Sequence, residues 1–264
     1  MNEWTERSVN FANQRNYLDE LYKVYPIVPN ERRDLSKSTI TSLQKAFDRD
    51  NDELVKKLLT LDVFPLKDSY VAYMKRDGEA IGRNPETVNR IAGTLHQMGF
   101  EDMIDRCSQP KETNRQIGPM FKTWIDKNVI GASIYRTGKE FIESSGNAIY
   151  SNSDAEMKKF CAEYFGYNRE KGIDFIARFN DIYVVGESKF LTDFGGHQNA
   201  QFADALSTIK SEFISVDGKK VIPIAILDGI LYIKGKNKMH KYLIDHPEEI
   251  IISSLILREF LYSL

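Results

Sequence analysis

The chain has 264 residues, of which 42% are hydrophobic and 28% are charged, and its formal net charge at pH 7 is −2. These proportions are typical of a soluble globular protein with a substantial core. No apolar run approaches the length that a transmembrane helix needs, which excludes a membrane-spanning protein. The small net charge excludes a general electrostatic attraction to nucleic acid, so any DNA site must be a local basic patch.

The two cysteines, Cys107 and Cys161, have no metal-ligand spacing around them. They are typical of free thiols in a reducing cytosol, and they do not suggest zinc. The N-terminal residues lack the basic and apolar regions of a signal peptide. We therefore expect a cytoplasmic protein.

The first third of the chain is predicted to be helical. Asn84 before Pro85 has the chemistry of a helix start, and residues 84–99 carry apolar side chains at helical spacing until Gly99. The pattern favours a helix that faces the core. The alternative is part of a helix-turn-helix, in which the side chains of Arg83, Asn89 and Arg90 would reach DNA.

A polar segment follows, and it carries the second candidate DNA contact. Asn114, Arg115 and Gln116 lie together in a predicted loop, and Lys122 follows in an apolar helix. Arg pairs in a bidentate manner with guanine, as Asn and Gln do with adenine. The segment is therefore either a DNA-reading loop or a polar connector without this role.

A further folded region is predicted to begin near Thr137, and in it residues 154–165 form a helix with an apolar stripe. Three acids, Glu140, Glu143 and Glu163, lie in this region, and each alone is more often a solvated helix residue.

Residues 172–190 read as a β-hairpin. Two runs rich in β-branched and aromatic residues flank Asn180-Asp181, a pair suited to a two-residue turn with positive φ. Such a turn pairs residues whose numbers sum to 361, which sets Asp174 across from Glu187 on one face. Lys189, two positions further, returns to that face.

The two faces of this hairpin differ in character. The apolar one is expected to carry eight residues: Ile173, Phe175, Ala177, Phe179, Ile182, Val184, Gly186 and Ser188. The other ends in two acids and a lysine. Two carboxylates held this close repel each other unless a proton or cation lies between them, and a hard cation such as Mg²⁺ is the natural occupant. The lysine would then hold or deprotonate an attacking water, or neutralise charge on a phosphate.

Asp174 followed by Glu187-Ser188-Lys189 resembles the D…ExK signature of the PD-(D/E)XK nuclease superfamily, and in particular type II restriction endonucleases. The wider match runs from about Thr137 to Lys236. The family motif usually has proline before the aspartate, where this chain has Ile173. The resemblance implies that Asp174, Glu187 and the Ser188 carbonyl bind Mg²⁺ and that Lys189 positions or activates water. The alternative is a salt-bridged hairpin end without chemistry.

After the hairpin, a glycine turn leads into a predicted helix from His197 to Phe213, whose first turn holds Gln198. In related nucleases this region often supports the metal site, which makes Gln198 a candidate supporting residue. The resemblance also implies that the helix before the hairpin often supplies a further acid; Glu140, Glu143 and Glu163 are the candidates, no spacing rule chooses between them, and Glu163 is taken as the supporting residue. Two further strands are predicted, at 220–227 and at 230–233, with a lysine-rich segment after them. The apolar C-terminal segment should be buried in the core or at a subunit interface.

Together with this resemblance, the predicted elements imply an α/β (α+β) fold, a restriction-endonuclease-like core with a central mixed sheet flanked by helices. We expect a mainly helical region over residues 1–110, serving DNA recognition or dimerisation, and the catalytic core over 111–264. The function expected is a type II restriction endonuclease that cuts double-stranded DNA with Mg²⁺, as a homodimer with a cognate DNA methyltransferase. The alternatives are a non-catalytic DNA-binding protein of this fold, or a repair or transposition nuclease.

Overall fold

A computed structural model describes residues 1–26, 32–110, 117–235 and 237–264. The chain divides into two compact units, one formed by residues 1–27 with 116–264 and the other by residues 28–115. The boundary expected at residue 110 lies close to residue 115, where the chain passes from the second unit back to the first. The first 26 residues, however, pack with the sheet unit, because their apolar side chains are buried against it.

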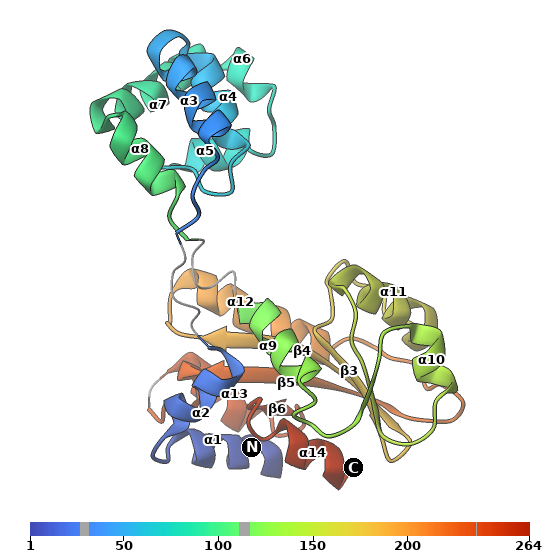
Figure 1. Cartoon of the computed structure of the whole chain (residues 1–264). Coiled ribbons are helices and arrows are strands. Elements are labelled where there is room, and N and C mark those ends of the chain that lie inside the picture. The colour runs from blue at the N-terminus through green and yellow to red at the C-terminus, as the bar shows by residue number, and fades with distance from the viewer. Residues whose placement is uncertain (27–31, 111–116, 236) are drawn as a thin grey trace. The chain divides into compact units, whose positions relative to one another are not determined.

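The sheet unit is built on a six-stranded sheet in the order β1-β2-β3-β4-β5-β6 (Figure 1). The strands are β1 (Ser133–Tyr135), β2 (Ala148–Tyr150), β3 (Phe175–Phe179), β4 (Ile182–Leu191), β5 (Val221–Gly229) and β6 (Ile251–Ile252). The pairs β2–β3 and β3–β4 are antiparallel, and the other three are parallel. The fold is therefore the mixed α/β architecture predicted from the sequence.

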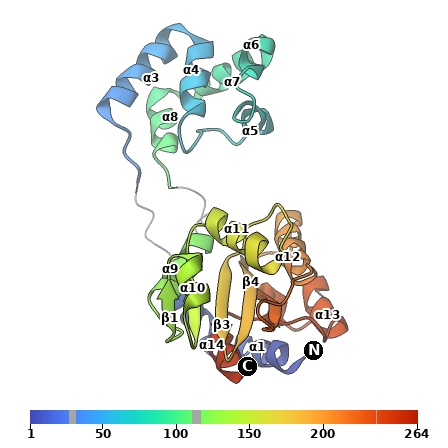
Figure 2. The same ribbon diagram turned by 90° about the vertical axis from the view of Figure 1, so that its right-hand side faces the viewer.

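Helices cover both faces of this sheet (Figure 2). They are α1 (Glu3–Ala12), α2 (Tyr17–Val24), α9 (Ile117–Asp126), α10 (Gly138–Glu143), α11 (Asp154–Phe165), α12 (Gly196–Ile209), α13 (Lys238–Asp245) and α14 (Leu257–Ser263). Side chains of α1, α2, α9 and α14 share a core cluster with Phe175, Ala177 and Phe179 of β3. Those of α10 and α11 share another with Ile176 of β3 and Val185 of β4. Side chains at alternate strand positions thus enter different clusters.

Two details differ from the sequence prediction. Ile173 packs in the cluster of Ile176 and Val185 rather than with Phe175, because β3 begins only at Phe175 and strand alternation does not extend back to residue 173. The segment predicted as a strand at 230–233 forms a 3-10 helix at Ile230–Tyr232. Gly229, with φ of 101°, turns the chain out of β5 at that point.

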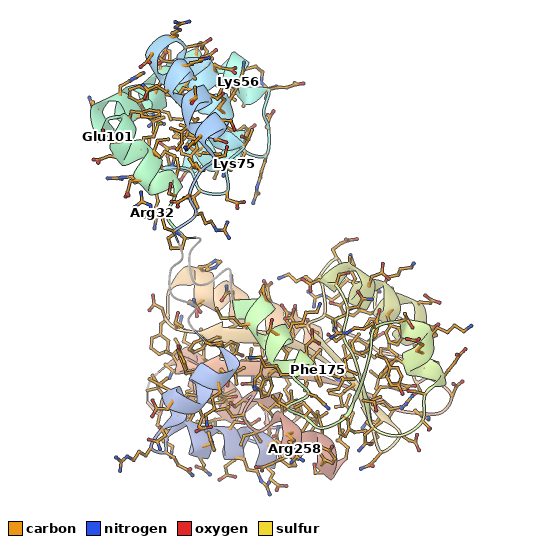
Figure 3. All side chains as sticks on the ribbon, viewed as in Figure 1. Arg32, Lys56, Lys75, Glu101, Phe175 and Arg258 are labelled. Atoms are coloured by element: carbon orange, nitrogen blue, oxygen red, sulfur yellow. The ribbon has the colours of Figure 1, made fainter. Side chains whose placement is uncertain are left out.

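The second unit is helical and has its own core. It contains α3 (Lys37–Arg49), α4 (Asn51–Leu59), α5 (Ser69–Met74), α6 (Ala80–Arg83), α7 (Pro85–Met98) and α8 (Phe100–Cys107). The polar side chains labelled in Figure 3, such as Lys56 and Glu101, are exposed, whereas Phe175 of the other unit is buried.

Helix α7 matches the predicted helix at 84–99, and Val88, Ile91 and Leu95 are fully buried. The core-facing interpretation of this helix is therefore confirmed. The polar side chains proposed to reach DNA have partners inside the unit: Arg83 pairs with Asp77, Arg90 with Asp68, and Asn89 accepts a hydrogen bond from Asn51.

Candidate active site at the end of the hairpin

The hairpin forms in the predicted register. Phe175 pairs with Gly186 and Phe179 with Ile182, so paired residue numbers sum to 361. Asn180 and Asp181 have φ angles of 46° and 65°, the positive values that a tight two-residue hairpin turn requires. Just before β3, the Asp174 N–H donates a 3.0 Å hydrogen bond to the Gly186 carbonyl, which holds Asp174 beside the end of β4.

The structure brings Asp174, Glu187 and Lys189 together. The Lys189 Nζ lies 2.8 Å from Glu187 Oε1 and 3.3 Å from Asp174 Oδ2. It also donates to the Ser188 carbonyl oxygen at 3.1 Å. The ammonium group therefore touches one oxygen from each of the three residues that the sequence assigned to a cation.

A backbone group of β4 fixes one of the carboxylates of the cluster. The Ser188 N–H donates a 2.8 Å hydrogen bond to Asp174 Oδ2, so this carboxylate is fixed by the strand that carries the other two groups. The Glu187 side chain is 5% exposed, and those of Asp174 and Lys189 are each 24% exposed. The site is thus largely shielded from water, and its Asp174 and Lys189 side chains stay partly exposed.

The neighbouring carboxylates determine the direction in which the pKa of Lys189 shifts. Burial alone lowers the pKa of Lys189, but the charges of Asp174 and Glu187 outweigh it and raise that pKa above its ordinary value. Lys189 therefore carries its proton at neutral pH beside the two carboxylates.

Sequence reasoning missed one neighbour of this cluster, Thr208. Its hydroxyl donates a 2.7 Å hydrogen bond to Glu187 Oε2, and its side chain is fully buried near the end of α12. The two oxygens of Glu187 thus have different partners, Lys189 and Thr208. Nothing in the local sequence marks Thr208, because the contact depends on how α12 packs on β4.

The candidate supporting residues do not contact the cluster. Gln198 is buried, but it accepts from the Thr192 N–H and donates to the Thr192 hydroxyl, which ties the loop after β4 to α12. Glu163 is exposed on α11. Glu140 accepts a hydrogen bond from the Thr137 hydroxyl, and Glu143 pairs with Lys139.

The predicted DNA-reading loop lies outside the described residues, since Asn114, Arg115 and Gln116 all fall in the segment 111–116. Lys122 is described; it lies on α9, half-buried, with its Nζ 3.9 Å from Asp154.

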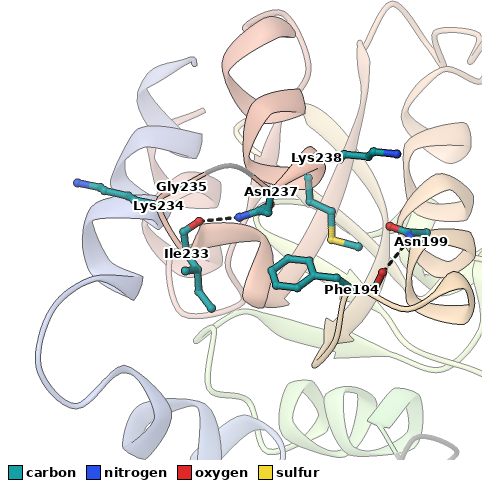
Figure 4. Close-up of a pocket in the computed structure, with 8 residues that line it drawn as sticks. Phe194, Asn199, Ile233, Lys234, Gly235, Asn237 and Lys238 are labelled. Carbon is teal, nitrogen blue, oxygen red and sulfur yellow. Dashed lines mark hydrogen bonds between the residues drawn. The ribbon is translucent and has the colours of Figure 1, made fainter.

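A second feature lies beyond the end of β4. A pocket of about 520 Å³ is lined by Phe194, Asn199, Ile233, Lys234, Gly235, Asn237, Lys238 and Met239 (Figure 4). Asn237 donates to the Ile233 carbonyl and Asn199 to that of Phe194, so both amides brace the pocket walls. In the described part of the chain, neither lysine forms an ion pair.

The donor set at the hairpin fits a hard cation, which prefers carboxylate and carbonyl oxygens. Over the described residues no group of three or more His, Cys, Asp or Glu side chains is placed to hold a metal. The hairpin offers two carboxylates and the Ser188 carbonyl, a set in which the backbone must supply the third ligand. The same residues contain no helix long and apolar enough to span a membrane.

Comparison with protein families gives one match over residues 2–264, to a family described as Tsp45I type II restriction enzyme. Comparisons with curated proteins and with solved structures gave no match.

Proposed function

Because the chain belongs to the Tsp45I family of type II restriction enzymes, we propose that it cuts both strands of DNA at a specific sequence by Mg²⁺-dependent phosphodiester hydrolysis. Family membership implies a nuclease that acts on DNA at defined sites. The metal dependence and the residues that carry the reaction are the proposal. The observation that supports them is the contact of the Lys189 ammonium with one oxygen each of Asp174, Glu187 and Ser188.

In this proposal Asp174, Glu187 and the Ser188 carbonyl hold Mg²⁺. The ion, when bound there, would supply a Lewis acid that polarises the scissile phosphate. Lys189 already occupies the meeting point of these oxygens as a cation, which indicates that the site favours positive charge. The Ser188 N–H and the Thr208 hydroxyl keep the two carboxylates oriented without moving into the site.

Lys189 has a role of its own in the reaction. Its protonated Nζ donates hydrogen bonds, so it holds an attacking water or neutralises charge that develops on the phosphate. Its place two residues after Glu187, on the same side of β4, keeps the ammonium next to the carboxylates throughout. Gln198 acts more distantly, by fixing the loop that follows β4.

DNA would be held by basic side chains near the hairpin. Lys234 and Lys238 line the pocket beyond the end of β4 and form no ion pair in the described part of the chain. Phe194 lines the same pocket and is 47% exposed. Lysines without partners suit phosphate oxygens, and an exposed aromatic ring suits a sugar or base. Asn114, Arg115, Gln116 and Lys122 are proposed as further DNA contacts.

The helical unit is proposed to serve sequence recognition or dimerisation. A palindromic target requires a two-fold dimer, so we propose a homodimer. A cognate DNA methyltransferase would protect the host sites, and the enzyme would work in the cytoplasm.

The experiment is digestion of phage and plasmid DNA with Mg²⁺ or with EDTA, using the wild type and three variants, Asp174→Asn, Glu187→Gln and Lys189→Ala. Lys159→Ala, which removes an exposed lysine of α11, is the matched control. We expect discrete fragments from the wild type and the control with Mg²⁺, none with EDTA, and none from the three variants, which should still shift DNA in a gel.

Other outcomes separate the alternatives. Smears or nicks instead of fragments would favour a repair or transposition nuclease. A gel shift without any cleavage would favour a non-catalytic DNA-binding protein. Normal cutting by Lys189→Ala would refute the site assignment.

A further inference from the structure

Tyr25 lies against the catalytic strand from the face opposite the acids. It follows directly on α2 and is 4% exposed. Its ring stacks on that of Phe190, with centroids 5.1 Å apart and planes 15° from parallel. Its hydroxyl oxygen lies 3.4 Å from Ser188 Oγ. Tyr25 therefore touches the residues on both sides of Lys189.

Strand geometry explains this arrangement. Side chains alternate between the two faces along β4, so Ser188 and Phe190 point away from the face that carries Glu187 and Lys189. A group that holds these two side chains fixes the backbone between them without entering the active site. That backbone includes the Ser188 carbonyl, and the Ser188 N–H that holds Asp174.

Tyr25 is anchored in turn by a buried carboxylate. Its hydroxyl donates a 2.9 Å hydrogen bond to Asp228 Oδ2. Asp228 stands opposite Phe190 on the neighbouring strand β5 and is fully buried. Ser253 donates to its other oxygen at 2.5 Å, and the Ser254 N–H donates to Oδ2 at 3.3 Å.

Asp228 is an unusual residue for a position that serves packing alone. Within the described ranges it forms no ion pair, and burial raises its pKa above the usual value. A buried carboxyl without a cation is costly unless hydrogen bonds compensate it, and an apolar residue would fill the space at lower cost. Its donors come from two distant parts of the chain, Tyr25 just after α2 and the serines that follow β6.

We propose that Tyr25 and Asp228 are positioning residues for cleavage: they hold the Ser188–Phe190 segment from behind, so that the Ser188 carbonyl, Asp174 and Lys189 keep their reactive arrangement. This inference rests on the proposed function, because it assigns a role toward that same site.

The test uses Tyr25→Phe, which keeps the ring on Phe190 and removes the hydroxyl. The matched control is Tyr232→Phe. Tyr232 is equally buried, and its hydroxyl donates to the Leu227 carbonyl at 2.8 Å without any hydrogen bond to Ser188 or Asp228. Both variants lose a buried tyrosine hydroxyl and the hydrogen bond that it donates, so a purely structural role predicts losses of stability in both and no change in cleavage kinetics in either.

We expect Tyr25→Phe to lower kcat about tenfold, the size of one lost hydrogen bond. It should also raise the Mg²⁺ concentration for half-maximal cleavage, with KM for DNA unchanged. Tyr232→Phe should keep the wild-type kcat and Mg²⁺ response even where its melting temperature falls. Wild-type kcat and Mg²⁺ response in a folded Tyr25→Phe protein would overturn the inference, as would equal kinetic losses in both variants.

Two further measurements complete the test. If Tyr25→Phe does not fold, Ser188→Ala removes the other side of the contact and should show the same kinetic change; full activity there would overturn the inference. Lys189→Ala is assayed in parallel. Normal cutting by that variant refutes the proposed function, whereas an inactive Lys189→Ala beside a fully active Tyr25→Phe refutes only the positioning role.

Discussion

Replacing Thr208 by valine is the sharpest test of how the site orients Glu187. Valine has nearly the shape of threonine, so the change removes the hydroxyl and little else. The lost bond is the 2.7 Å hydrogen bond to Glu187 Oε2, inside a site where Glu187 is 4% exposed. Water therefore cannot readily replace the donor, and the carboxylate gains freedom to rotate toward Lys189.

The expected size of the effect follows from this geometry. A hydrogen bond to a charged acceptor contributes about 1.5–3 kcal/mol, and about 1.4 kcal/mol corresponds to a tenfold change in rate. If the orientation of Glu187 matters fully in the transition state, kcat should fall by about tenfold to about 150-fold. The Mg²⁺ concentration for half-maximal cleavage should rise, because Glu187 is one of the proposed ligands.

The assay is single-turnover cleavage of phage DNA over a range of Mg²⁺ concentrations. Thr208→Ser is the matched control, since it keeps the hydroxyl and loses only a methyl group. We expect the serine variant to stay close to the wild type in kcat and in its Mg²⁺ response. Wild-type behaviour of Thr208→Val would refute the reasoning, because Glu187 would then need no second partner.

Three further predictions follow from other parts of the structure. Arg178→Leu should lower the free energy of unfolding by about 3 kcal/mol or more, measured with urea, because each buried acceptor left unpaired costs about 1–3 kcal/mol. The buried Arg178 donates to the carbonyls of Phe141 and Gly146 and to the Ser144 hydroxyl, and an unchanged unfolding midpoint would contradict this role. The double change Lys234→Ala with Lys238→Ala should weaken DNA binding without Mg²⁺ and lower the slope of log affinity against log salt by about 1.8, at about 0.9 per phosphate contact. Fluorescence anisotropy measures both quantities, and an unaltered slope would remove the pocket from the DNA path. Neither cysteine should react with a thiol reagent in the native protein, because both are buried and burial raises the pKa of Cys107 to about 12 and that of Cys161 higher still. Two thiols should appear on denaturation, whereas rapid native labelling would contradict the packing around them.

The sequence alone determined the features that depend on local geometry. The positive-φ turn at Asn180-Asp181 and the two-residue period of the strands set the hairpin register. They thereby placed Asp174, Glu187 and Lys189 on one side. Helical periodicity likewise identified the buried face of α7. These predictions succeed because turn chemistry and side-chain alternation act between residues that are close along the chain.

Local patterns also misled in identifiable places. The apolar run at 230–232 resembles a strand, but Gly229 turns the chain out of the sheet and a 3-10 helix follows. Ile173 continues the alternation of apolar residues in the sequence, yet β3 begins only at Phe175. In both cases the pattern continued beyond the point where the strand's hydrogen bonds exist.

Only the tertiary structure decided which distant residues serve the hairpin. Thr208 reaches Glu187 across 21 positions, and Tyr25 reaches Ser188 across 163. It also decided that the first 26 residues cover the sheet rather than join the helical unit. The physical reason is that such contacts follow from how whole helices pack on the sheet, and no spacing within a single segment encodes that packing.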